Sequence, residues 1–239
     1  WMVNLSTDAT DRILTSQGPF GLAISGNKAY VACEGDGGTG VLDVVDLEAQ
    51  KVEKKVELGR LVALPGDEPW GPGVSVSGTQ VFVTDNQESG RIFVVDFSGS
   101  EPKVSSLNAG GRPQAIRQLK DGLHSYVLNK RDPSGVTVID RVTGAKGETI
   151  TISDGLGDPR ALALPPDPLL GRRLLYIFYE QELVFYDLDL ETEVGRFEFT
   201  DDATARAVSA AVTPDGMGML IGLERAPLGR RLLFLRFGN

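Results

Sequence analysis

The side chains best able to do chemistry in this sequence are carboxylates that follow short apolar runs. They are Glu34, Asp36, Asp85, Glu88, Asp132, Glu180, Glu182 and Glu224. If the runs are equivalent strands of a repeated unit, the loops after them reach one face of the protein. Oxygen ligands that converge there can bind Ca²⁺, or Mg²⁺ in a hydrolase site. The alternative is that these residues are solvated turns of an acidic protein and that no cofactor binds.

A second group of candidate residues is basic. Arg160 and Arg206 stand one residue after the start of equivalent units, and Arg112 stands just before another. Guanidinium groups bind carboxylates and phosphates well because their forked donors match planar acceptors. We therefore predict that the three arginines contribute to partner binding. The alternative is that they pair with neighbouring acids such as Asp158 and Asp202.

The long connection from Gly59 to Gly73 carries apolar residues and Trp70. Tryptophan is enriched at the energetic centres of protein interfaces. Trp70 is therefore a predicted anchor for a partner protein. The alternative is that this connection folds back and covers the protein's own core.

Most catalytic and metal-binding signatures are absent from the sequence. A nucleophilic serine or cysteine needs a nearby base, and His124 is the one histidine. Cys33 is the one cysteine, so the chain has no internal disulfide, no Cys-x-x-Cys-His haem motif and too few ligands for a usual zinc site. Cys33 alternates with Val31 and is predicted to pack in the core, whereas His124 is predicted in an exposed turn. No catalytic residue is assigned, which favours a non-enzyme.

Charge and hydropathy restrict the partners. The 239 residues include 24 Lys and Arg against 33 Asp and Glu, so the net charge is −9 and nucleic acid is an unfavourable partner. No apolar stretch approaches the roughly 20 residues that a transmembrane helix needs. The chain begins Trp1-Met2-Val3, which we interpret as a processed, trimmed or incomplete start that leaves any upstream export signal or anchor out of view.

An internal repeat dominates the sequence. Four apolar runs end in aspartate, at Asp46, Asp96, Asp140 and Asp187, and a weaker copy ends at Asn4. Their spacings lie in the forties to fifty, as for a four-stranded propeller blade. Each aspartate is expected to accept a hydrogen bond from backbone two residues on and so to start a turn.

The same order of elements surrounds each aspartate. A further strand follows it, predicted at 12–15, 52–58, 148–152 and 194–199. Gly or Pro then marks the start of the next unit, which begins with a strand of small apolar residues, as at 21–24 and 160–164. A strand rich in aromatic and β-branched residues follows, at 29–32, 81–84, 125–128, 175–178 and 219–222. No helical period is sustained, so we predict an all-β propeller of four-stranded antiparallel blades in one domain, residues 1–239.

The number of blades has two interpretations. Inner strands begin near residues 20, 73, 114, 160 and 207, whereas six segments resemble third strands, including Trp1–Leu5 and Leu232–Phe237. The chain therefore starts and stops in the same part of a blade. Either five blades form a ring that the N-terminal strands (1–15) close, or the chain is part of a six- or seven-bladed ring.

Two strands resemble a known repeat family. Phe82-Val83-Thr84-Asp85-Asn86 and Tyr126-Val127-Leu128-Asn129 resemble the Tyr-Val-Thr-Asn signature of YVTN propellers, and Thr213-Pro214-Asp215-Gly216 resembles the preceding turn of that family. The resemblance implies a periplasmic, secreted or cell-surface location. Some propeller lactonases hold a metal with Glu, Asn and Asp near the axis, and by this resemblance Asp85, Asn86 and Asn129 are the candidate ligands.

These observations lead to a ranked set of functions. The leading hypothesis is a non-catalytic extracytoplasmic recognition module, an accessory subunit of a larger membrane or surface assembly with another protein as partner. The alternative is a metal-dependent, lactonase-like hydrolase with its site at the axial loops. A third, weaker hypothesis is an accessory subunit of a redox complex whose cofactor sits on a neighbouring chain.

Overall fold

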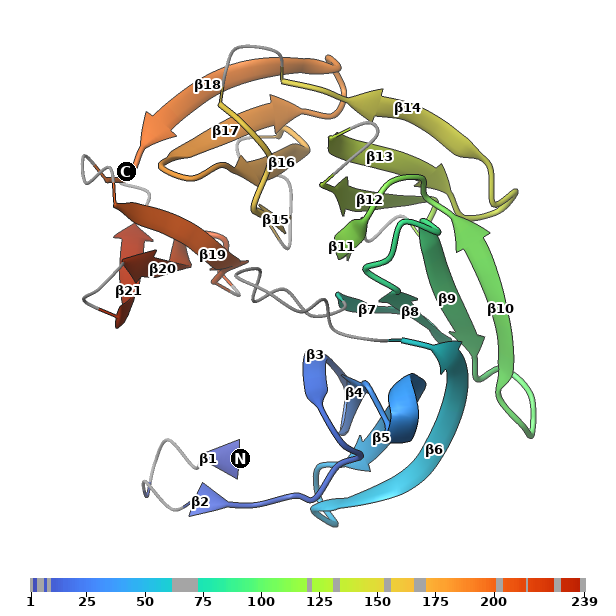
Figure 1. Ribbon diagram of the computed structural model, residues 1–239. Coiled ribbons are helices and arrows are strands. Elements are labelled where there is room, and N and C mark those ends of the chain that lie inside the picture. The colour runs from blue at the N-terminus through green and yellow to red at the C-terminus, as the bar shows by residue number, and fades with distance from the viewer. Residues whose placement is uncertain are drawn as a thin grey trace. The chain divides into compact units, whose positions relative to one another are not determined.

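The computed structural model describes residues 2–3, 7, 10–61, 73–119, 122–130, 134–152, 156–165, 171–200, 204–213, 215–225 and 229–236. Strands dominate these residues, and one short 3₁₀ turn, Asp36–Gly38, is the helical element among them (Figure 1). The chain divides into two compact units, residues 1–116 and 117–239. Each unit is described by itself.

The first unit contains one short hairpin and two four-stranded antiparallel sheets. The hairpin pairs β1 (Met2–Val3) with β2 (Thr10–Asp11). The first blade consists of β3 (Pro19–Ser25), β4 (Lys28–Cys33), β5 (Thr39–Asp46) and β6 (Lys51–Arg60). The second blade consists of β7 (Val74–Ser77), β8 (Gln80–Thr84), β9 (Arg91–Asp96) and β10 (Lys103–Asn108).

The unit boundary falls inside β11 (Pro113–Gln118), the first strand of the third blade. That blade continues with β12 (His124–Asn129), β13 (Gly135–Asp140) and β14 (Lys146–Ile150). The fourth blade consists of β15 (Ala161–Ala163), β16 (Leu174–Phe178), β17 (Glu182–Asp187) and β18 (Thr192–Glu198). The last sheet has three described strands, β19 (Ala205–Val212), β20 (Gly218–Arg225) and β21 (Gly229–Arg236).

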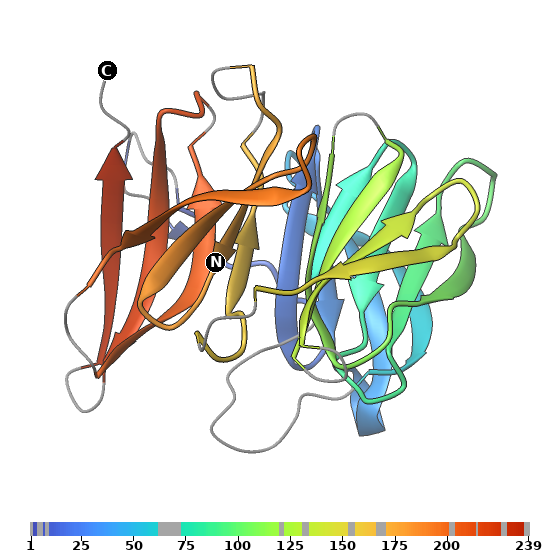
Figure 2. The same ribbon diagram turned by 90° about the horizontal axis from the view of Figure 1, so that it is seen from above.

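These sheets confirm the predicted fold class, an all-β propeller of antiparallel blades. In every blade the strands follow one another in chain order, as repeated hairpins require. Five inner strands, β3, β7, β11, β15 and β19, begin near the predicted residues. The sheets are twisted, so β18 runs obliquely to β15 within the fourth blade (Figure 2). The two interpretations of the complete ring, and its status as one domain, stay predictions.

The aspartates that end the third strands start turns as predicted. Each carboxylate accepts a hydrogen bond of 2.8–2.9 Å from the backbone N–H two residues on, at Asp46–Glu48, Asp96–Ser98, Asp140–Val142 and Asp187–Asp189. These bonds favour the ionised carboxylate, and bonding to Ala49 and Glu48 N–H lowers the pKa of Asp46. The repeat thus has a local physical cause.

Apolar side chains hold neighbouring blades together within each unit. We call the side of a blade that packs on the next blade its forward face, and the opposite side its rear face. In the first unit Leu42 and Val56, on the forward face of the first blade, pack with Val83 and Phe93 on the rear face of the second. In the second unit Tyr176 packs with the last sheet in the same way. Contact between blades, rather than one central core, therefore buries the apolar surface.

The strand predicted at 12–15 is wrong. The strand there is β2, Thr10–Asp11. Residues 12–16 cross the rear face of the first blade outside its sheet, whereas Gln17 and Gly18 accept backbone hydrogen bonds from Gly35 (3.0 Å) and Glu34 (2.9 Å). Ser16 donates its backbone N–H (2.5 Å) and its hydroxyl (2.9 Å) to the buried carboxylate of Asp43. Ile13 packs against a small cluster that includes Val31 and Val45. These side-chain contacts, together with the backbone bonds of Gln17 and Gly18, fix the segment.

Cys33 lies in that cluster and is fully buried, as its alternation predicts. Burial, and then the negative charge of Asp43, raise the pKa of its thiol to about 11. An unfolded thiol has a pKa near 8.5, so the folded state holds this proton more tightly. The stability that this provides is complete below about pH 8.5 and is lost as the pH rises toward 11.

Urea unfolding of the wild type and of Cys33→Ala at pH 8 to 11 tests this effect. We expect the difference in free energy of unfolding between the two proteins to fall by about 2–3 kcal/mol across this range, at 1.36 kcal/mol for each unit of pKa shift. Taking the difference removes the titration of other groups. Parallel pH profiles for the two proteins would show that the thiol titrates equally in both states.

Candidate functional site

Asp85, a predicted metal ligand, is fully buried and is used inside its own loop. Its carboxylate accepts hydrogen bonds from the backbone N–H of Gln87 (3.0 Å), the hydroxyl of Ser89 and Nε of Arg91 (3.2 Å). The Arg91 contact is also an ion pair. A cation at this carboxylate would have to compete with a guanidinium and with two hydrogen-bond donors.

The two predicted asparagine ligands are also buried. Asn86 has a φ of 51° and accepts a hydrogen bond from Nε2 of Gln114 at 3.4 Å in the first unit. Asn129 belongs to the second unit, where its Nδ2 donates to the hydroxyl of Thr137 at 2.6 Å. The described residues include no group of three or more His, Cys, Asp or Glu side chains able to hold a metal ion. The metal site stays a prediction.

Two of the predicted partner-binding arginines form ion pairs with acids of neighbouring loops. Arg112 contacts Glu88 at 2.9 Å, and Arg160 contacts Glu180. Pairing with neighbouring acids was the alternative prediction, but the acids are not the expected ones. Asp158, which was one of those expected, accepts a hydrogen bond from Ser134 at 2.7 Å. The two arginine side chains are mostly buried, whereas their glutamate partners are exposed, so each ion pair contributes little stability.

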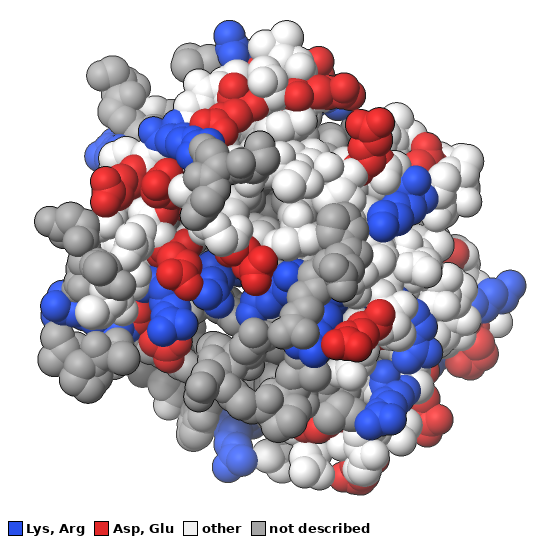
Figure 3. Space-filling model, turned by 45° about the horizontal axis from the view of Figure 1, so that its top comes forward, with Lys and Arg blue, Asp and Glu red and all other residues white. Residues whose placement is uncertain are grey.

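Of the remaining residues predicted to bind a partner or to pair with the arginines, the structure describes Arg206 alone. Arg206 is exposed on β19, where it lies opposite Glu224 in the register with β20. On the face drawn in Figure 3, basic side chains lie beside acidic ones. Trp70 and Asp202 lie outside the described residues. Their predicted roles stay predictions.

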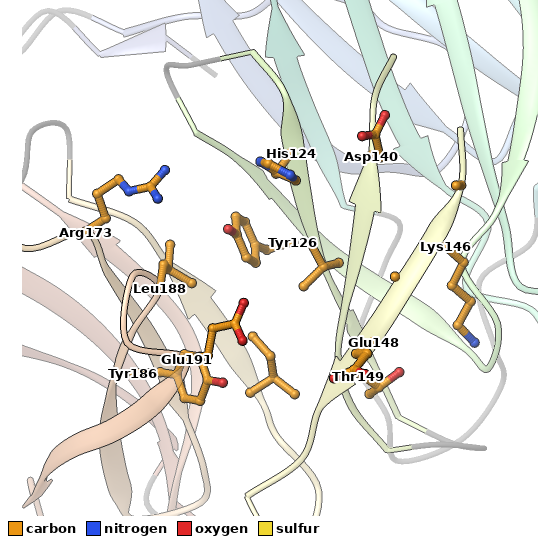
Figure 4. A pocket seen from close by; sticks show the side chains of 14 residues that line it. His124, Tyr126, Asp140, Lys146, Glu148, Thr149, Arg173, Tyr186, Leu188 and Glu191 are labelled. Atoms are coloured by element: carbon orange, nitrogen blue, oxygen red, sulfur yellow. The ribbon is translucent and has the colours of Figure 1, made fainter. Parts of the chain in front are cut away.

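A concave site lies between the third and fourth blades, inside the second unit. It is a groove of about 700 Å³, which we call the interblade groove (Figure 4). The third blade contributes six of the polar lining residues, and the fourth contributes three polar residues and Leu188. The labelled lining residues are His124, Tyr126, Asp140, Lys146, Glu148, Thr149, Arg173, Tyr186, Leu188 and Glu191.

Strand alternation positions the third-blade side of the interblade groove. His124 and Tyr126 are two residues apart on β12 and therefore point to the same face. Asp140 lies directly opposite His124 at the end of β13. Hydrogen bonds from the backbone and side chain of Thr143 lower the pKa of Asp140, and the charge of His124 adds a smaller contribution. The carboxylate is thus held ionised at the edge of the groove.

The fourth blade places a tyrosine, an arginine and a glutamate against this wall. Tyr186 is half-buried near the end of β17, and burial raises the pKa of its phenol, with smaller contributions from Glu191 and Glu148. Glu191 has a φ of 53°, and Arg173 donates to Asp189 at 2.8 Å from Nε. In Figure 4 Arg173 and Glu191 extend toward Tyr126. The groove therefore offers aromatic surface and charges of both signs, which suits binding of an amphipathic segment.

Sequence reasoning did not find the interblade groove. His124 was expected in an exposed turn, but it starts β12 and is half-buried. Arg173 lies just before the strand predicted at 175–178, and Tyr186 lies in the apolar run that ends at Asp187, and neither position indicates a groove. The available signal was the alternation of Phe185 and Tyr186, which places the two rings on opposite faces of β17. Nothing in the sequence indicated that Tyr126 and Tyr186 line the same groove.

Comparison with known proteins supports the fold. The chain is similar to the solved structure of *Kuenenia stuttgartiensis* hydrazine synthase, with a TM-score of 0.66 and 20% sequence identity. The match covers 96% of this chain and 69% of that chain. The likeness shows the fold alone. No protein-family model and no curated protein matches the sequence. Among the described residues, no helix is long and apolar enough to cross a membrane.

Proposed function

We propose that this chain is a non-catalytic protein-recognition module of the YVTN propeller type. It acts in the periplasm or at the cell surface, as an accessory subunit of a larger membrane or surface assembly. The observation that supports this best is the interblade groove, where Tyr126, Tyr186 and Arg173 come together from two blades. Tyr and Arg are, with Trp, the residue types enriched among the residues that dominate binding energy at protein interfaces.

The hydrolase alternative has less support from the described residues. Its central ligand, Asp85, already accepts three hydrogen bonds, one of them from the cation Arg91. A hydrolytic metal site needs an open coordination position for water as well as the ligands themselves. We therefore give preference to the binding role, in which Asp85 shapes its loop.

Partner capture with matched arginine variants tests the proposal. Wild-type protein, Arg173→Ala and Arg172→Ala are immobilised and exposed to an extract of periplasmic and membrane proteins. Arg173 lines the interblade groove, whereas its neighbour Arg172 does not. We expect Arg173→Ala to weaken capture of the wild-type partner about tenfold, which corresponds to 1.4 kcal/mol, and Arg172→Ala to retain it.

A second measurement distinguishes the lactonase-like hydrolase from the recognition module. Purified wild-type protein is analysed for Ca²⁺ and Mg²⁺ and is assayed with simple lactones. The proposal expects no hydrolysis above that of buffer. Stoichiometric metal together with hydrolysis that Asp85→Ala abolishes would replace the recognition role with the lactonase-like one.

A further inference from the structure

The interblade groove continues into a second groove inside the same unit. The second groove has a volume of about 390 Å³, and both are lined by Thr149, Ile150, Tyr186 and Glu191, so we call the two together the extended groove. Along the third blade, eight consecutive residues (145–152) line it. At about 3.3 Å for each extended residue, eight residues span roughly 26 Å. A site of this length suits an extended stretch of polypeptide better than a compact small molecule.

Two glutamates lie near the middle of the extended groove. Glu148 is exposed on β14 of the third blade, and Glu191 is exposed in the turn between β17 and β18 of the fourth. Burial raises the pKa of the Tyr186 phenol most, and the charges of Glu191 and Glu148 raise it further, so both carboxylates act on this ring. Within the described part of the chain, neither glutamate forms a hydrogen bond or an ion pair.

The basic residues that line the extended groove do not neutralise these two carboxylates. Arg173 and Arg196 donate to acids of their own blade, at 2.8 Å and 2.7 Å, so their charges are balanced there. Lys146 extends away from Glu191, on the far side of its strand (Figure 4). The middle of the extended groove therefore combines uncompensated negative charge with an aromatic ring, an environment that favours a cation.

We infer that the extended groove binds an extended segment of the partner protein, with a Lys or Arg side chain of that segment between Glu148 and Glu191 and against Tyr186. The two carboxylates accept charge-assisted hydrogen bonds from this cation, and the phenol ring offers it a π face. Arg173, which extends toward Tyr126 in Figure 4, contacts another part of the segment. The inference rests on the proposed function, because it specifies the chemistry of the partner that the recognition module captures.

Binding of labelled octapeptide pools to the full chain, followed by fluorescence anisotropy, tests the inference. The pools carry Arg, Lys or Gln at the fourth position and uncharged residues elsewhere. The wild type is expected to bind the Arg and Lys pools about tenfold more tightly than the Gln pool. Glu148→Gln/Glu191→Gln should lose this preference, and its fold should persist, because Gln50 already adopts the φ of 53° found at Glu191. Glu57→Gln/Glu198→Gln changes the net charge equally at exposed glutamates outside the groove and should keep the preference.

The outcomes separate this inference from the proposed function. Equal binding of the three pools by the wild type, or no binding of any pool, overturns the inference, as does a preference that survives Glu148→Gln/Glu191→Gln. Displacement of the Arg pool by butylguanidine at equal concentration would identify an isolated cation as the occupant and overturn the extended segment. Partner capture that depends on Arg173 but not on the two glutamates would leave the recognition role standing without this inference. A preference for basic pools with capture independent of Arg173 would support the inference and count against the proposed test residue alone.

Discussion

Leu183→Ala is expected to lower the free energy of unfolding by about 3–5 kcal/mol, the range for buried leucines truncated to alanine. Leu183 is fully buried on β17, opposite Phe178, in the cluster between the fourth blade and the last sheet. Its removal leaves a cavity in the packed interface between the two sheets, among Phe178, Met219 and Ile221, which are all fully buried. Urea unfolding followed by circular dichroism measures the loss.

Leu232→Ala is the matched control. Leu232 stands at the equivalent place on β21, opposite Gly222, but is exposed, so its truncation is expected to change stability by no more than about 0.5 kcal/mol. The measurement is made at concentrations below any self-association, because association would stabilise the wild type. Equal losses for the two leucines would show that the forward face of the last sheet is covered in the monomer.

Features with a local cause were predictable from the sequence. The turns at Asp46, Asp96, Asp140 and Asp187 need only a carboxylate and a backbone N–H two residues away, so the repeat could be interpreted correctly. The burial of Cys33 followed from strand alternation. Four of the five inner strands were found because Gly or Pro marks their starts.

Features that depend on distant partners were not predictable. The strand predicted at 12–15 followed from its place in the repeat, yet the segment is held by Asp43, which lies 27 residues from Ser16. The arginines were predicted to bind a partner, with pairing to Asp158 and Asp202 as the alternative. The observed pairing of Arg160 with Glu180 depends on loop geometry. The interblade groove depends on how two blades pack, and its aromatic residues looked like ordinary strand residues.

Asp43→Ala is the second substitution for which we expect a large effect, a loss of about 3–4 kcal/mol in the free energy of unfolding. The carboxylate of Asp43 is fully buried and accepts both the backbone N–H and the hydroxyl of Ser16. Lys55 donates to the same hydroxyl at 3.0 Å and completes a network. Hydrogen bonds to a charged group contribute about 1.5–3 kcal/mol each, and their loss leaves the Ser16 N–H without this acceptor.

The partner variants show how this loss is divided. Ser16→Ala keeps the backbone N–H bond and removes the hydroxyl, so it should cost less than Asp43→Ala, and the double-mutant cycle should give a coupling of about 1–2 kcal/mol. Because Cys33 Sγ lies 3.9 Å from the Asp43 carboxylate under the same segment, Asp43→Ala should also speed its reaction with a thiol reagent. If Asp43→Ala were as stable as the wild type and left Cys33 equally protected, contacts of Ile13 rather than the carboxylate would hold residues 12–18 on the first blade.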